Sequence, residues 1–259
     1  MYRASASHGV AWVTGASSGI GRTVAIELAR RGYKVAATAR RKDELAALAA
    51  ASDNIFSFPG DVVDGAHMAA LMREIEAAHG PIALAFLNAG IYFPAEADRF
   101  SAGLTWRTFE INVGGVVNCL DPILAAMLSR GGGQIAINAS LAGYGGIPGS
   151  TAYGATKAAL IYMAEALKLT YEPKGLTVQV VNPGFVRTEM TAHNTHFEMP
   201  FLMDAEQAAR IICEGFERGG FEIAFPRRLA WFAKAVRLLP YALFFPVMER
   251  ATREARRDL

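Results

Sequence analysis

The sequence predicts an α/β fold: a doubly wound parallel sheet of about seven strands with helices on both faces. Short apolar runs rich in Val, Ile and Ala alternate with longer segments of helical period, which indicates βαβ units. The apolar runs contain few polar residues, as expected for parallel strands that are buried on both faces. With 259 residues, of which 52% are hydrophobic, the chain is long enough to bury one large core.

The expected elements follow one another along the chain. Strands are predicted at Val10–Thr14, Lys34–Ala39, Ile55–Pro59, Ile82–Asn88, Gly133–Asn138, Thr177–Pro183 and Gly220–Ala224. Helices are predicted to begin near Ile20, Asp43, Gly65, Leu104, Ser150 and Asp204, several of them at residues that can cap a first turn. No internal repeat or Pro/Ser-rich linker is found. We therefore expect one domain over residues 1–226 and a helical extension over 227–259.

Composition and charge exclude several classes of protein. The formal net charge is +2 and 19% of residues are charged, which is typical neither of a disordered acidic chain nor of a nucleic-acid-binding protein. Cys119 and Cys213 are far apart and have no neighbouring cysteine at metal-ligand spacing, which favours a reduced, cytoplasmic setting. The first ten residues have no apolar run of signal-peptide length, and no 18-residue apolar run predicts a spanning helix.

A glycine-rich segment follows the first expected strand, Thr14-Gly-Ala-Ser-Ser-Gly-Ile-Gly21, and leads directly into a helix. Gly15 permits a tight turn, Gly19 lets the backbone approach a pyrophosphate, and Gly21 allows close packing of helix and strand. The free N–H groups of the helix start attract the anion. This strand–loop–helix context predicts a Rossmann-type dinucleotide site. Its expected contacts in this loop are Gly15, Ser17, Ser18, Gly19, Ile20 and Gly21.

The end of the second strand indicates which dinucleotide is preferred. A carboxylate at this position accepts hydrogen bonds from the adenosine ribose and repels a 2′-phosphate. The chain has Ala39 there, followed by Arg40, whose guanidinium suits a phosphate, so NADP(H) is preferred over NAD(H). A solvated charge run over Arg40–Lys42 is the alternative. Asp61 and Val62 are expected near the adenine, and Asn88-Ala89-Gly90 where the backbone passes the cofactor.

Together with Ser140 and the segment Tyr153-Gly-Ala-Thr-Lys157, these motifs stand in the order of the short-chain dehydrogenase/reductase family, which residues 9–226 resemble. The resemblance implies that Ser140 and Tyr153 hold the substrate oxygen, that Lys157 binds the nicotinamide ribose, and that Asn112 supports a proton relay. An asparagine that only satisfies a helix kink is the alternative for Asn112. The resemblance also implies cofactor contacts from Pro183, Gly184, Val186 and Thr188, and a homodimer or homotetramer. The chain departs from the family pattern at Leu87 and Ala139, where many members have Asn and Ser.

The chemistry supports these roles. Hydride transfer to a carbonyl carbon leaves negative charge on oxygen, which requires a proton donor and a second hydrogen-bond donor, Tyr153 and Ser140. Lys157 lies one helical turn from Tyr153, and its charge is expected to lower the pKa of the tyrosine. The leading prediction is therefore an oxidoreductase that interconverts a carbonyl and an alcohol. An epimerase or dehydratase on the same fold, and a nucleotide-sensing protein without catalysis, are the alternatives.

The remaining features concern metal, substrate and membrane. His193, His196 and Glu198 fall in a segment expected to cover the substrate, and no metal site is predicted. Residues 227–259 combine aromatic and leucine residues with eight Lys/Arg against three Asp/Glu, and Pro240 and Pro246 are expected to divide them into short helices. This extension suits contact with a membrane surface, a cover over the active site, or a subunit interface. A lipophilic small-molecule substrate is expected by analogy with related extensions in the family, and no nucleic acid is expected as a partner.

Overall fold

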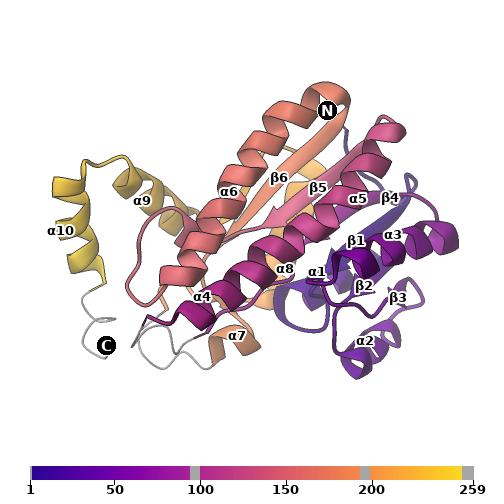
Figure 1. Ribbon diagram of the computed structural model, residues 1–259, viewed down its shortest axis with the longest axis horizontal. Helices are drawn as coiled ribbons and strands as arrows, with labels where there is room; N and C mark the ends of the chain where they lie inside the picture. Colours follow the sequence, from indigo (N-terminus) through magenta and orange to yellow (C-terminus); the bar gives the residue numbers. More distant parts are fainter. Residues whose placement is uncertain (1, 94–99, 193–198, 253–259) are drawn as a thin grey trace.

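Seven strands form one parallel sheet in the computed structural model, which describes residues 2–93, 100–192 and 199–252 (Figure 1). The strand order is β3-β2-β1-β4-β5-β6-β9. The strands are β1 (Val10–Thr14), β2 (Val35–Thr38), β3 (Ile55–Ser57), β4 (Ile82–Leu87), β5 (Gly133–Asn138), β6 (Leu176–Pro183) and β9 (Glu222–Phe225). The predicted doubly wound sheet is confirmed, and the order reverses between β1 and β4, which is where such sheets bind ligands.

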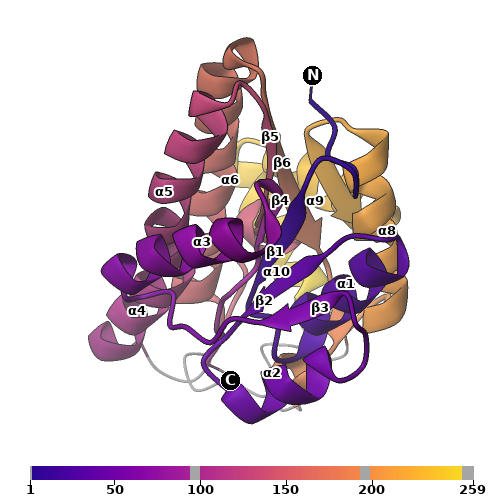
Figure 2. The same ribbon diagram turned by 90° about the vertical axis from the view of Figure 1, so that its right-hand side faces the viewer.

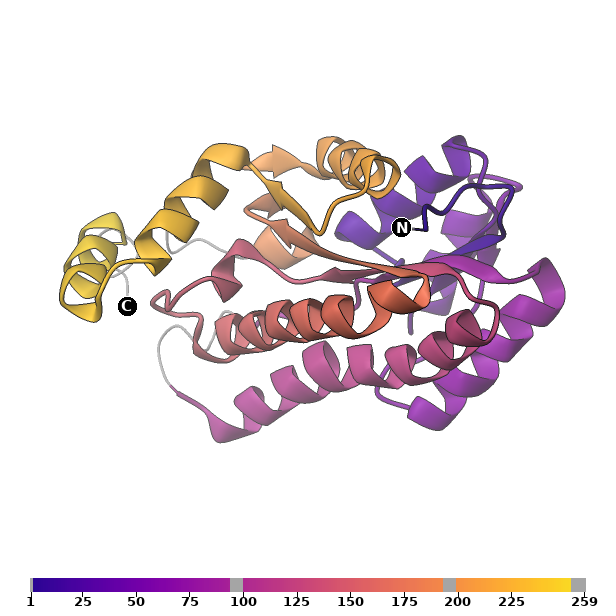
Figure 3. The same cartoon turned by 90° about the horizontal axis from the view of Figure 1, so that it is seen from above.

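Helices cover both faces of the sheet, as Figures 2 and 3 show. One face carries α1 (Gly19–Arg30), α2 (Lys42–Ala49) and α8 (Ala205–Arg218). The other carries α3 (Gly65–His79), α5 (Gly115–Ser129) and α6 (Thr151–Tyr171). Each face has its own apolar core, and successive strand residues alternate between the two: Ala11 and Val13 face the α1 side, while Val10 and Trp12 face the α5 side. Because both faces are buried, the strands read as continuous apolar runs.

The helix expected near Leu104 begins at Ala102 and is longer than a single regular helix. α4 (Ala102–Phe109) continues through a π-helical turn, Glu110–Gly114, into α5. The whole run, Ala102–Ser129, is the one stretch of the described residues that is long and apolar enough to cross a membrane. It packs against α3 and α6, as a core helix of the fold does.

Short elements after β6 were not predicted. β7 (Val186–Arg187) and β8 (Met203–Asp204) pair in a separate two-stranded sheet, and α7 (Glu189–Ala192) is a single turn between them. Strands of two residues are too short to produce an alternating pattern, which explains why the sequence did not indicate them.

The extension after β9 consists of α9 (Arg227–Arg237) and α10 (Tyr241–Ala251), and Figures 1 and 3 show α10 at one end of the molecule. Pro240 separates the two helices as predicted, but the break expected at Pro246 is wrong because this proline lies inside α10. A proline removes one intrahelical hydrogen bond, and the carbonyl that loses its partner belongs to the exposed Ala242. The division at residue 226 stays a prediction.

Candidate active site

The carboxyl ends of the central strands surround a cleft of about 410 Å³. Residues from the ends of β1, β2, β4, β5 and β6 line it, together with the start of α1 and one turn of α6. A parallel sheet brings these strand ends to one edge, so residues that are far apart in sequence meet there. The cleft is therefore located at the switch point between β1 and β4.

The glycine loop forms one side of the cleft. Gly15 and Gly19 have φ angles of +68° and +53°, values that favour glycine. A Cβ on Gly15 would lie 2.8 Å from Cα of Ala89, and a Cβ on Gly21 would lie 2.3 Å from the carbonyl oxygen of Gly15. Gly21 does not line the cleft, and its small size serves the packing of helix against strand that the sequence suggested. The loop thus has room for an anion at the start of α1.

Asn88 connects this loop to the neighbouring strands. Its Nδ2 donates to the carbonyl oxygen of Thr14 at 3.0 Å, and its backbone N–H donates to Oγ1 of Thr14 at 2.9 Å. Its Oδ1 accepts a hydrogen bond of 2.8 Å from Nδ2 of Asn138. Asn88 therefore holds the ends of β1, β4 and β5 in a fixed relation beneath the cleft.

Two arginines stand where the adenosine ribose is expected. Arg40 lines the cleft, and its Nη1 lies 3.9 Å from Oδ2 of Asp61. Arg41, which the sequence analysis did not single out, donates from Nε to Oγ of Ser17 at 3.2 Å and from Nη1 to Glu189 at 3.1 Å. Both guanidinium groups are about half exposed. The two side chains together place positive charge next to the glycine loop.

Ser140, Tyr153 and Lys157 meet at the other end of the cleft. Ser140 follows β5 and is buried, with its hydroxyl near the carbonyl oxygen of Pro183 at 3.3 Å. Tyr153 and Lys157 lie on successive turns of α6, and the Lys157 Nζ stands 5.5 Å from the centroid of the Tyr153 ring. Lys157 is only 3% exposed and donates to the carbonyl oxygen of Asn138 at 2.8 Å.

Burial controls the ionisation of this pair. Desolvation raises the pKa of Tyr153 to about 12, a hydrogen bond with Ser140 opposes the rise, and nearby Tyr92 adds to it. Desolvation lowers the pKa of Lys157 to about 8. The net shift of the Tyr153 pKa in this structure is therefore upward, opposite to the expected direction, because the effect of burial dominates.

Asn112 lies in the π-helical turn and is fully buried. Its Oδ1 accepts from the backbone N–H of Ile91 at 2.7 Å, and its Nδ2 donates to the carbonyl oxygen of Ile91 and to Thr156 at 3.0 and 3.1 Å. It does not line the cleft. In this geometry the side chain positions the segment after β4 and the helix of Tyr153, so both interpretations offered by the sequence stay open.

Asn138 is a cleft residue that sequence reasoning missed. It is 9% exposed, and because its Nδ2 faces Asn88, its Oδ1 is the atom left over. Among the described residues, that oxygen has no hydrogen-bond partner although it is buried. Because Asn138 lines the cleft, its unsatisfied acceptor fits a bound dinucleotide, which has hydroxyl and amide donors. The glycine loop fits the same ligand because it leaves room for phosphate groups. The sequence showed that Asn138 ends a strand, but the direction of its side chain depends on tertiary packing.

The structure brings nearly all the predicted contacts together. All predicted cofactor contacts other than Gly21 line the cleft, as does Ser140: Gly15, Ser17, Ser18, Gly19, Ile20, Arg40, Asp61, Val62, Asn88, Ala89, Gly90, Tyr153, Lys157, Pro183, Gly184, Val186 and Thr188. The cleft is also lined by Arg41, Asn138 and Met190. His193, His196 and Glu198 lie outside the described residues, so the expectation of no metal there stays a prediction.

Comparison with known proteins gives consistent matches. The family model described as short chain dehydrogenase matches residues 9–198. An "uncharacterized oxidoreductase" of Myxococcus xanthus is 36% identical over 242 residues, which cover 92% of this chain and 95% of that protein. A 3-oxoacyl-acyl-carrier-protein reductase of Staphylococcus epidermidis is 33% identical over 186 residues, covering 70% of this chain and 76% of the relative. A solved short-chain dehydrogenase from Streptomyces avermitilis has a TM-score of 0.78 at 26% identity, with 96% and 97% of the two chains covered.

Proposed function

Because the chain belongs to the short-chain dehydrogenase/reductase family, we propose that it reduces a lipophilic carbonyl compound with NADPH, or runs the reverse oxidation. Membership makes it an oxidoreductase that acts on CH–OH or C=O groups. The choice of cofactor, the substrate and the residue roles are the proposal. The observation that supports it most strongly is the meeting of Ser140, Tyr153 and Lys157 in the cleft that the glycine loop borders.

The proposed proton donor is Tyr153. A bound nicotinamide supplies the hydride, and the new alcohol oxygen needs a proton. The Tyr153 hydroxyl donates that proton while the Ser140 hydroxyl donates a hydrogen bond to the same oxygen. Lys157 is largely an ammonium at neutral pH, since its pKa is about 8, and its charge favours the phenolate that Tyr153 becomes. The substrate side also has Tyr92, whose ring lies 5.3 Å from that of Tyr153.

The proposed preference for NADP(H) rests on the two arginines at the end of β2. A 2′-phosphate at the adenosine ribose gains from both cations, whereas an unphosphorylated ribose gains most from a carboxylate, which this position lacks. Arg40 is held only loosely by Asp61, at 3.9 Å, and is free to turn toward a phosphate. Arg41 is already directed to Ser17 of the glycine loop. We include both residues in the phosphate site.

The proposed setting is the reduced cytoplasm, with the chain in a homodimer or homotetramer. Cys119 and Cys213 are buried free thiols, and burial raises the pKa of each to about 12, so neither is poised to react. Trp106 on α4 and Tyr162 and Leu169 on α6 are at least 74% exposed on two helices that contact each other. Large exposed apolar side chains on adjacent helices support a subunit interface there.

Calorimetric titration of NADPH and NADH tests the cofactor proposal. We expect wild-type protein to bind NADPH at least tenfold more tightly, and Arg40→Ala and Arg41→Ala each to lose about 1–2 kcal/mol for NADPH with little change for NADH. Arg73→Ala, an exposed arginine on α3, is the matched control. Equal affinities in wild-type protein would contradict the phosphate site.

The reaction is tested separately with lipophilic ketones. Oxidation of one NADPH per alcohol formed supports the reductase, whereas product formed without net NADPH consumption would favour the epimerase or dehydratase. NADPH binding without turnover of any carbonyl compound, together with no loss of affinity in Lys157→Ala, would favour a nucleotide sensor, which needs none of the three catalytic groups.

A further inference from the structure

Exposed apolar side chains are concentrated in the C-terminal extension. Of the fourteen large hydrophobic residues that are exposed in the described chain, six fall between residues 231 and 245. They are Trp231 (66%), Phe232 (45%), Leu238 (86%), Tyr241 (65%), Leu243 (55%) and Phe245 (57%). We call these six residues, together with the arginines described below, the C-terminal surface. Such a concentration exceeds the scattered apolar residues that any protein surface has, and indicates a contact site.

The fold does not need these side chains for its own core. α9 is attached through Ala230 and Val236, which are buried, and through an ion pair between Lys234 and Glu222 of β9. α10 is attached through Phe244, its single buried residue. The inner side of each helix is therefore already packed, and the exposed apolar residues lie on the remaining sides.

The same helices are basic. Arg227, Arg228, Arg237 and Arg250 have no ion-pair partner within the described part of the chain, and the one acidic residue of the two helices is Glu249. Trp231 of α9 and Leu238, the residue that follows the helix, are seven positions apart and therefore lie on the same side. Arg227, one turn before Trp231, lies on that side too. Aromatic and leucine side chains interleaved with unpaired arginines match the boundary layer of an anionic bilayer.

We propose that α9 and α10 bind the surface of a membrane that contains anionic phospholipids. Each helix has 11 residues, which at 1.5 Å per residue is about half of what a bilayer core requires, so the helices lie along the surface and do not cross it. The apolar side chains enter the region between headgroups and acyl chains. The arginines bind phosphate groups, and Trp and Tyr rings are suited to this layer because they are apolar with one polar atom.

A second copy of the chain is the less favourable occupant. A two-fold symmetric interface places the same patch of both copies together, so the unpaired arginines of one copy would face those of the other. No acidic cluster is available on the two helices to neutralise them. The exposed residues of α4 and α6 offer another patch for self-association, where the cations Arg107 and Lys168 are paired with Glu110 and Glu172. An anionic bilayer compensates the arginines, whereas a copy of the same surface does not.

The extension also packs against a segment that leads to the cleft. Phe244 packs on Gly145, where an added Cβ would lie 3.2 Å from the phenyl ring. Gly145 belongs to the segment between Ser140 and Tyr153, which leads from one catalytic residue to the other. Membrane binding through α10 brings this segment close to the lipid, from which an apolar carbonyl compound can enter. That consequence rests on the proposed function, whereas lipid binding itself does not.

Tryptophan fluorescence of the full chain provides a direct test. The chain has three tryptophans: Trp12 is fully buried, Trp106 lies on α4, and Trp231 belongs to the C-terminal surface. In Trp106→Phe, Trp231 is therefore the one exposed tryptophan. With phosphatidylglycerol/phosphatidylcholine vesicles we expect a blue shift and quenching by brominated acyl chains, with partition at least tenfold stronger than for phosphatidylcholine alone. High salt should weaken the binding.

Matched variants then locate the contact by co-sedimentation with the same vesicles. Arg227→Gln and Arg228→Gln should each weaken partition about fivefold, and Trp231→Ser with Leu238→Ser should weaken it more than tenfold. Tyr162→Ser, an equally exposed aromatic residue on α6, should change nothing. NADPH affinity serves as the folding control for every variant. If the wild-type protein did not bind NADPH, that result would count against the proposed function without affecting the lipid result.

Three outcomes would overturn the proposal. The first is no binding of wild-type protein to anionic vesicles at low salt. The second is equal partition of wild-type protein and the Trp231/Leu238 variant. The third is a wild-type protein that does not bind vesicles but forms a dimer in sedimentation equilibrium, when the Trp231/Leu238 variant is monomeric. That result would assign the C-terminal surface to a second copy of the chain.

Discussion

Lys157 and Glu27 are both buried charged residues, but they lie at opposite edges of the sheet and have different partners. Lys157, at the carboxyl edge, is 3% exposed, and among the described residues its ammonium donates to one backbone carbonyl and has no carboxylate partner. Glu27, near the end of α1 at the amino edge, is 8% exposed and accepts hydrogen bonds from Arg30 and Arg31. The charge of Glu27 is compensated, and that of Lys157 is not.

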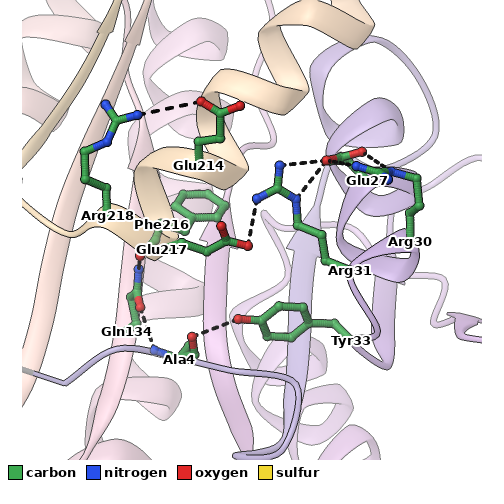
Figure 4. A network of polar contacts seen from close by, with 10 residues as sticks. All are labelled: Ala4, Glu27, Arg30, Arg31, Tyr33, Gln134, Glu214, Phe216, Glu217 and Arg218. Atoms are coloured by element: carbon green, nitrogen blue, oxygen red, sulfur yellow. Dashed lines mark hydrogen bonds and ion pairs between the residues drawn. The ribbon is translucent and has the colours of Figure 1, made fainter.

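The partners of Glu27 belong to a polar network that Figure 4 shows in close view. Arg31 lies between Glu27 of α1 and Glu217 of α8, with ion-pair distances of 2.7 Å to each. Nearby, Tyr33 donates to the carbonyl oxygen of Ala4, whose N–H donates to Gln134 of β5. The network thus ties the N-terminal segment, α1, α8 and the central sheet together.

The pKa values reflect this difference. Hydrogen bonds from the arginines hold the pKa of Glu27 at about 2, whereas desolvation alone brings the pKa of Lys157 down to about 8. The lowered pKa of Glu27 means that its ionised form contributes to stability, whereas an uncompensated charge in a cleft is typical of a functional site that gains its partner on binding. We therefore expect the charged residues of the amino edge to contribute to stability, and the uncompensated charge at the carboxyl edge to carry an energetic cost that the proposed function explains. Four predictions test this contrast.

Replacement of the proposed proton donor should have the largest effect. Tyr153→Phe keeps the ring and its packing but removes the hydroxyl, and we expect kcat for ketone reduction to fall about a thousandfold. NADPH affinity, measured by titration, should stay within threefold of wild type. Tyr162→Phe, an exposed tyrosine on the same helix, is the control and should be fully active. A loss of less than tenfold in Tyr153→Phe would show that another group donates the proton.

Removal of the uncompensated charge should stabilise the protein without cofactor. Lys157→Met keeps an unbranched side chain of nearly the same length and removes the amino group. At pH 7 we expect the free energy of unfolding to rise by about 3 kcal/mol, the value of a pKa lowered from 10.5 to about 8. Above pH 8 the folded state loses the Lys157 proton while the unfolded state keeps it, so the stability of the wild-type protein rises. The difference in free energy of unfolding between wild type and variant should therefore disappear toward pH 10.5. Urea unfolding across this pH range measures the difference in stability. A difference that does not change with pH would attribute the effect to packing.

Removal of the compensated charge should act in the opposite direction. Glu27→Gln should lower the free energy of unfolding at pH 7 by about 2 kcal/mol, because the carboxylate is stabilised by its arginines. The lowered pKa means that this stabilisation is full above about pH 4.5 and disappears as pH falls through about 2, so the two proteins should converge in acid. Glu214→Gln, whose exposed side chain lies 3.7 Å from Arg218, should cost less than 0.5 kcal/mol. Loss of NADPH affinity in Glu27→Gln would contradict the separation of the two edges.

The contrast also separates what the sequence can predict from what it cannot. The strands Val10–Thr14 and Gly133–Asn138 were predicted with the bounds that the structure has, because uninterrupted apolar runs flanked by Gly or polar residues are a local signal. The proposed catalytic pair of Tyr153 and Lys157 is a local signal too, because residues that lie four positions apart on a helix share a face. Ser140 joins them because parallel strands end at one edge.

Features that depend on side-chain direction were not predictable. The sequence predicted Arg40 at the ribose but did not show that Arg41 contacts Ser17, because two consecutive residues after a strand differ only in how the loop turns. Arg31, which pairs with Glu27, also pairs with Glu217 of α8, which lies 186 residues later in the sequence. No local sequence pattern indicates a contact between residues so far apart. The reversed shift of the Tyr153 pKa likewise follows from burial, which a sequence does not show.

Replacement of Asn138 should produce the smallest of these effects, and it can be compared with replacement of a second buried asparagine, Asn182. The Oδ1 atoms of Asn138 and Asn182 are both buried without a hydrogen-bond partner in the described structure, but only Asn138 lines the cleft. If the carboxyl edge is built to gain partners on binding, Asn138→Ala should weaken NADPH binding about fivefold, the value of one hydrogen bond. The bond from Lys157 should persist, because it goes to the backbone oxygen of residue 138.

Asn182→Ala is the matched control, because it removes a similar side chain from the neighbouring strand end. It breaks contacts with Tyr144 and Glu222 and should lower the free energy of unfolding by about 1 kcal/mol, comparable with the loss of the Asn88 contact in Asn138→Ala. NADPH affinity, measured by titration under conditions where both variants are folded, should decrease in Asn138→Ala alone. Equal losses in the two variants would mean that the affinity follows stability, and the orphaned oxygen in the cleft would then have no part in cofactor binding.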